Sequence, residues 1–123
     1  MIVAGFGFST RAGMASLRDA LARACAAAGI DAPHMLATAD DKTAALAPLA
    51  QALGVPVQGI APDSLAAQVT HTRSARVAHE RATGSVAEAA ALAAAGPHAR
   101  LLCPRHHAED RLATCALAEG TPR

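Results

Sequence analysis

Three helical segments of this chain each end at a glycine, and a short apolar run follows each glycine. The segments with apolar residues at helical spacing are Leu17–Ala28, Leu46–Leu53 and Ser85–Ala95, ending at Gly29, Gly54 and Gly96. Glycine there permits the left-handed turn that satisfies the last carbonyl groups of a helix. The apolar runs are His34–Thr38, Val55–Ile60 and Arg100–Cys103, and a further run, Ile2–Phe8, opens the chain. Strands that alternate with helices in this way predict an α/β layered fold.

The remaining segments fit a single domain that covers residues 1–123. The final run, Leu112–Leu117, predicts a fifth strand, antiparallel and at an edge of the sheet. The third helix has almost no polar face beyond Glu88, so we expect it to be buried on all sides. Pro62–Leu65 predicts a brief helical turn, and Gln68–Thr83 predicts a loop with a short strand near Val77.

Composition excludes several classes of function. The chain is 52% hydrophobic, yet it has no Trp or Tyr and two Phe, so its core must consist of Ala, Leu, Val and Ile. A net charge of +1 gives no basis for binding nucleic acid, which needs a clustered basic face. No segment approaches the ~20 apolar residues that span a bilayer. The first residues form a strand rather than a basic leader, and three widely spaced cysteines indicate no disulfide framework, so we expect a cytoplasmic protein.

The first strand-to-helix junction contains Gly5-Phe6-Gly7-Phe8, followed by Arg11. In open α/β sheets ligands bind beyond the carboxyl ends of the strands, where glycines let a ligand approach the backbone N–H groups. Thr10 stands where a dinucleotide-binding motif needs its third glycine, which disfavours a nucleotide site. Arg11 can hold a carboxylate or phosphate bidentately. The simpler alternatives are a tight strand exit and a solvated arginine.

Two further junctions offer cations or free N–H groups. Thr38 to Lys42 holds the only lysine of the chain, and this ammonium beside Thr38 can bind an anionic group. Alternatively, an aspartate caps the helix and Lys42 is solvated. Gly84 and Ser85 open the third helix, whose N-terminus favours anions, although Ser85 and Glu88 have the spacing of a capping box. If the three junctions lie at corresponding ends of parallel strands, they converge on one face.

The histidines and cysteines near the C-terminus give weaker signals. Cys103, His106 and His107 are ligand types for zinc or cobalt, and Cys115 follows them. Their spacing fits no closed four-ligand pattern, so we expect a solvated loop and no metal site. No serine, histidine and aspartate, and no cysteine and histidine, stand at a spacing diagnostic of nucleophilic catalysis.

Taken together, these segments resemble the CobE / CbiG C-terminal domain family of cobalamin biosynthesis. The resemblance covers almost the whole chain and includes the Gly5–Gly7 turn and Arg11. Its more specific motifs are LATADDK at Leu36–Lys42, LGVPV at Leu53–Val57, GSVAEAAAL at Gly84–Leu92, LLCPR at Leu101–Arg105 and ATCA at Ala113–Ala116. Where the family often has paired arginines after its first turn, Arg11 stands alone, and Arg105 replaces a usual lysine.

The resemblance implies a three-layer α/β/α domain with a mixed, mostly parallel sheet of about five strands. It also implies work on corrin or precorrin intermediates, macrocycles that carry several acetate and propionate groups. We expect such a ligand to be bound and handed over, or its processing assisted, by Gly5, Gly7, Arg11, Thr38, Lys42, Gly84 and Ser85, with no cofactor. The alternatives are an enzyme that opens a ring lactone with Asp40 or Glu88 as base, and a docking subunit for another cobalamin-pathway enzyme.

Overall fold

The computed structural model describes residues 1–67 and 83–120, and the side chains of residues 66–67 and 83–85 lie outside this description. The short strand expected near Val77 lies outside the described residues. Five strands form one sheet in the order β3-β2-β1-β5-β4. Their bounds are β1 Ile2–Phe8, β2 Met35–Ala39, β3 Val57–Ile60, β4 Arg100–His107 and β5 Ala113–Glu119.

Both parallel and antiparallel pairs occur in this sheet. Strand β1 pairs in parallel with β2, and β2 with β3, whereas β5 is antiparallel to both β1 and β4. Because β5 alone runs against the others, all the remaining strands end at the same edge of the sheet. The predicted mixed α/β fold is therefore confirmed, with its parallel pairs gathered at the β3 end.

Two strand predictions were wrong in position or length. The last strand was expected at an edge, but β5 lies between β1 and β4, and its residues Ala113–Ala118 are all buried. A continuous buried run is typical of an interior strand. The edge position belongs to β4, which continues past Cys103 to His107, where a loop was expected. Two register shifts in its pairing with β5 accommodate this extension, and an edge strand tolerates Pro104 and polar side chains.

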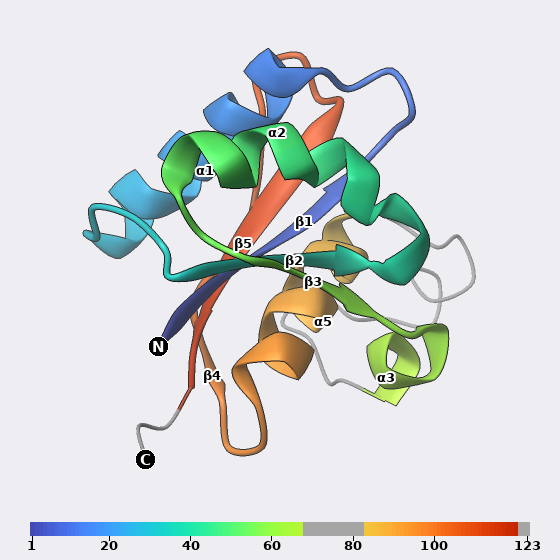
Figure 1. Cartoon of the computed structure of the whole chain (residues 1–123). Coiled ribbons are helices and arrows are strands. Elements are labelled where there is room, and N and C mark those ends of the chain that lie inside the picture. The colour runs from blue at the N-terminus through green and yellow to red at the C-terminus, as the bar shows by residue number, and fades with distance from the viewer. Residues whose placement is uncertain (68–82, 121–123) are drawn as a thin grey trace.

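Helices cover both faces of the sheet and give the expected three layers (Figure 1). Helices α1 and α2 lie on one face, and α3 and α5 lie on the other; their bounds are α1 Met14–Ala28, α2 Thr43–Leu53, α3 Pro62–Ala67 and α5 Thr83–Ala95. A 3-10 turn, η1, occupies Asp40–Lys42 ahead of α2. Left-handed backbone at Gly29, Gly54 and Gly96 (φ 72°, 72° and 100°) confirms the predicted helix ends.

The middle of helix α5, residues 87–92, is buried on all sides, as its sequence predicted, whereas residues 93–95 are half-buried. The helix contacts every strand of the sheet, and Ala87, Ala89, Ala90 and Ala91 are at most 4% exposed. It approaches closely because two glycines face it: a Cβ on Gly5 would lie 2.1 Å from the Ala87 carbonyl oxygen, and one on Gly120 would lie 2.3 Å from that of Ala95. These contacts also orient the helix. Since Gly120 pairs with Met1 at the start of β1, the N-terminal end of α5 points toward the carboxyl end of β1.

Candidate functional site

The carboxyl edge of the sheet brings the first two junctions together. Strand β1 ends at Phe8 and β2 ends at Ala39, and both strands run in the same direction. The Nζ of Lys42, in the turn after β2, donates a hydrogen bond of 2.5 Å to the Phe8 carbonyl oxygen. The same ammonium lies 5.1 Å from the centre of the Phe8 ring, within the range of a cation–π contact. Lys42 is therefore held at the end of β1 and is not a freely solvated side chain.

The Lys42 ammonium keeps capacity for a ligand. It is half-buried, and the bond to Phe8 uses one of its three N–H donors. Because the aliphatic stem crosses from the β2 junction to the end of β1, the charge has a defined position. A fixed ammonium loses less conformational freedom on binding an anion than a mobile one does.

Arg11 lies in the turn that follows β1. Its backbone N–H is bonded to the Ser9 hydroxyl at 3.2 Å, and the N–H of Ala12 is bonded to the Ser9 carbonyl oxygen at 3.1 Å. The side chain of Arg11 is exposed, and it forms no ion pair within the part of the chain that the structure describes. The turn is thus ordered by Ser9, while the side chain of Arg11 is exposed, three residues after the Phe8 that Lys42 contacts.

Gly5, Gly7 and Thr38, which we expected to contact a ligand, lie buried within strands. Gly5 and Gly7 lie inside β1 and are buried, so they do not form the turn that follows the strand. Gly5 is covered by α5, and the Gly7 carbonyl oxygen accepts a 3.2 Å hydrogen bond from the Thr114 hydroxyl. The buried Thr38 hydroxyl donates to the Phe6 carbonyl oxygen at 2.9 Å and so joins β2 to β1. The described contacts of these groups are internal to the fold.

The third junction lies at the same end of the molecule, because the N-terminal end of α5 points that way. Helix α5 spans Thr83–Ala95, so Gly84 and Ser85 lie in the part of the helix nearest its N-terminus. Glu88 is fully buried, and its carboxylate accepts a 3.0 Å hydrogen bond from the backbone N–H of Arg105 in β4. Of the two proposed catalytic bases, Asp40 alone is exposed, in η1.

The cysteines and histidines near the C-terminus belong to the sheet. Burial raises the pKa of the Cys103 and Cys115 thiols, and also that of Cys25 on α1. His106 and His107 lie in β4, and the His106 Nδ1 is 2.9 Å from the Pro104 carbonyl oxygen. Within residues 1–67 and 83–120, no three side chains of the metal-binding types gather as an ion would require.

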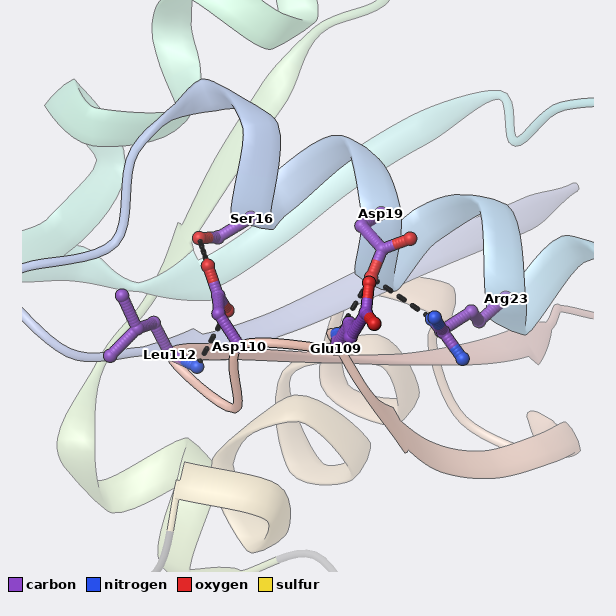
Figure 2. A network of polar contacts seen from close by, with 6 residues as sticks. All are labelled: Ser16, Asp19, Arg23, Glu109, Asp110 and Leu112. Atoms are coloured by element: carbon purple, nitrogen blue, oxygen red, sulfur yellow. Dashed lines mark hydrogen bonds and ion pairs between the residues drawn. The ribbon is translucent and has the colours of Figure 1, made fainter.

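A polar network that the sequence did not indicate joins α1 to the turn between β4 and β5 (Figure 2). The Ser16 hydroxyl donates to the Asp110 carboxylate, which also accepts a 2.9 Å bond from the backbone N–H of Leu112. Asp19 accepts a 2.7 Å bond from the backbone N–H of Glu109 and forms an ion pair with Arg23 at 2.9 Å. These partners lie up to 94 positions apart, and no local pattern marks them.

Comparison with known proteins identifies the family. The family described as cobalamin synthesis G C-terminus matches residues 2–118. The chain belongs to this family. Cobalamin biosynthesis protein chiG from Agrobacterium tumefaciens str. C58 is 33% identical, with a TM-score of 0.76 over 99% of this chain and 100% of that one. CobE, a protein from the cobalamin (vitamin B12) biosynthetic pathway, is 34% identical, with a TM-score of 0.80 over 96% and 92%.

A cobalamin biosynthesis protein G homolog from Sulfolobus solfataricus shares the fold at 18% identity, with a TM-score of 0.75. The alignment covers 99% of this chain and 37% of that longer protein. The comparison with curated proteins gave no match. Family membership and the two closer structures make this chain a cobalamin biosynthesis protein. Among the described helices, none has both the length and the apolar character that crossing a membrane requires.

Proposed function

We propose that the chain binds a polycarboxylate corrin or precorrin intermediate and hands it over or helps to process it. The observation that carries the proposal is the contact of Lys42 with Phe8, which fixes a cation of the β2 junction at the end of β1. The loop that presents Arg11 begins at the same point. A macrocycle with several carboxylates needs several cationic contacts on one face, and this edge supplies them from separate elements.

Each contact has a distinct role in the proposal. Arg11 is exposed, so its planar guanidinium can hold one carboxylate through two parallel hydrogen bonds. Lys42 acts as a positioned point charge for a second carboxylate. The first turn of α5, with Gly84 and Ser85, adds backbone N–H groups and the positive end of the helix dipole. The buried Gly5, Gly7 and Thr38 hold these elements together beneath the ligand.

An absorbance titration with hydrogenobyrinic acid tests the proposal. We expect a saturable spectral change, and affinity about ten-fold weaker for Arg11→Gln and for Lys42→Met, because each loses a charge-assisted contact. Arg100→Gln is the matched control, since Arg100 lies at the opposite end of β4 and pairs with Glu119. No spectral change at stoichiometric concentrations would refute binding and favour a docking subunit for another pathway enzyme, in the cytoplasm.

The exposure of Asp40 favours one second candidate, an enzyme that opens a lactone ring of the same ligand. Asp40 stands two residues before Lys42, whereas the Glu88 carboxylate is buried against Arg105. Water activated by Asp40 could attack a carbonyl beside the lysine charge. Turnover of a lactone-containing precorrin by the isolated chain, lost in Asp40→Asn, would establish this candidate. Tight binding without turnover would leave the carrier role.

A further inference from the structure

The C-terminal end of β4 lies on the same edge of the sheet as the proposed ligand contacts. His107 pairs with Thr114 of β5, and the Thr114 hydroxyl donates to Gly7 of β1. His107, Thr114 and Gly7 therefore form a row across three neighbouring strands. At about 4.8 Å between strands, the end of β4 is about 10 Å from the end of β1. A ligand that spans the edge of the sheet can reach both ends.

Four basic side chains gather at this end of β4. Arg105, His106 and His107 are consecutive and half-buried, and Arg111 follows in the exposed turn. The backbone N–H of Arg111 is bonded to the carbonyl oxygen of Ala108, the residue after His107, so the turn places Arg111 beside the end of β4. Burial lowers the pKa of His107, and Arg105, Arg111 and His106 lower it further. Within the described ranges 1–67 and 83–120, the side chains of Arg105 and Arg111 form no ion pair.

The carboxylates near this group are mostly engaged elsewhere. Asp110 faces α1, where it accepts from the Ser16 hydroxyl, and it also accepts from the backbone of Leu112. Glu88 is buried and accepts from the backbone N–H of Arg105, leaving the guanidinium out of that bond. Glu109 is the exposed carboxylate of the turn, and its backbone N–H is bonded to α1. The positive charges of the group are thus left without neutralising ion pairs inside the described fold.

Backbone strain at Arg111 adds a separate observation. Its φ is 62°, in the left-handed region where a long side chain is unfavourable and Gly or Asn is preferred. The turn needs this conformation because the Arg111 N–H is bonded to the Ala108 carbonyl oxygen, within a hairpin closed by the bond from Ala108 to Ala113. Strained residues of this kind concentrate at ligand sites.

The geometry points to an anion-binding cluster formed by Arg105, His107 and Arg111, which binds a carboxylate group at the C-terminal end of β4. The identity of the ligand as a corrin intermediate rests on the proposed function, but the cluster stands on its own contacts. The two guanidinium groups grip the carboxylate, and the imidazole of His107 donates a further hydrogen bond. Together with Arg11 and Lys42, the cluster lets one ligand be held at both sides of β5.

Histidine imidazole NMR with citrate, a small tricarboxylate, tests the cluster at constant pH and ionic strength. We expect the His107 signals to move saturably while those of His34, at the opposite end of the sheet, stay in place. Arg111→Asn suits the left-handed backbone and removes the charge, and it should weaken citrate binding about ten-fold. Arg105→Gln should act likewise, whereas Arg100→Gln should bind citrate as the parent chain does.

The outcomes separate this inference from the proposed function. A His107 response to citrate that is equal in the parent chain and in Arg111→Asn, or no response at all, overturns the cluster. A citrate response with no hydrogenobyrinic acid binding keeps the cluster and refutes the corrin ligand. Hydrogenobyrinic acid binding that depends on Arg11 but is unchanged in Arg111→Asn overturns the cluster while keeping the proposed function. Thermal unfolding of each variant checks that the fold is intact.

Discussion

Among the seven glycines whose surroundings the structure describes, Gly5 is the one where replacement by alanine should destabilise the chain most. The new Cβ would lie 2.1 Å from the Ala87 carbonyl oxygen and 2.5 Å from the Ala91 nitrogen, and both are backbone atoms. Ordinary contact begins at 3.4 Å, so α5 would have to move away by about 1.3 Å. Because α5 contacts all five strands, such a movement loosens one whole face of the sheet. We expect a loss of about 3 kcal/mol, the upper part of the range for overpacked cores.

Thermal and urea unfolding followed by circular dichroism measure this loss. For a chain of this size, about 3 kcal/mol corresponds to a fall in Tm of about 10 °C. Gly13→Ala is the matched control, because no atom lies within 4 Å of its added Cβ and its φ of −108° is open to any residue. If Gly5→Ala costs no more than Gly13→Ala, the close approach of α5 to β1 is not what the glycine serves, and the reasoning fails.

Three other predictions concern groups inside the fold. Hydrogen bonds, first from the Glu109 backbone to Asp19 and from the Ser16 hydroxyl to Asp110, lower both aspartate pKa values. The ionised carboxylates therefore stabilise the fold fully above the ordinary pKa of 3.8, and this stabilisation is lost as pH falls through the lowered pKa values. In Asp110→Asn, which lacks one of these carboxylates, the urea midpoint should fall less steeply with decreasing pH than in the parent chain. Thr38→Val should cost about 1–2 kcal/mol in urea unfolding, because the Phe6 carbonyl oxygen loses its buried donor; a change within error would contradict this role. Burial raises the pKa values of the three thiols, those of Cys25, Cys103 and Cys115. They should therefore react slowly with a disulfide reagent at pH 8 and rapidly in urea, and fast labelling of the native chain would count against their burial.

The elements of the fold could be predicted from the sequence because each is marked locally. Helices ended at glycines with left-handed backbone, and the apolar runs became strands. The place of the last strand could not be deduced from its neighbours in sequence, since strand order is set by long-range pairing. Its uncharged run Ala113–Ala118 was the available signal for an interior position. The extension of β4 to His107 was hidden because an exposed edge strand carries the same polar residues as a loop.

The sequence predicted the strand-to-helix junctions that form the candidate site, but not the contacts between them. That Lys42 bonds to Phe8, 34 positions earlier, follows from the parallel pairing of β1 and β2 and from no local pattern. Gly5 shows the opposite difficulty. A glycine in a strand can leave room either for a ligand or for a closely packed helix, and the sequence around it looks the same in the two cases. The helix that needs Gly5 lies more than 80 positions away, so the sequence alone could not decide.

The packing of α5 limits how the carboxyl edge can bind a ligand. With Gly5 covered and the Thr38 and Thr114 hydroxyls bonded to carbonyl oxygens of β1, the interior of the strands offers a ligand few free donors. Contacts must then come from side chains beyond the strand ends and from the first turn of α5. Arg11 and Lys42 are such side chains, and they act through charge rather than through backbone shape. Removing a charge there should therefore weaken ligand binding without lowering the stability of the fold, whereas Gly5→Ala should lower the stability by displacing α5.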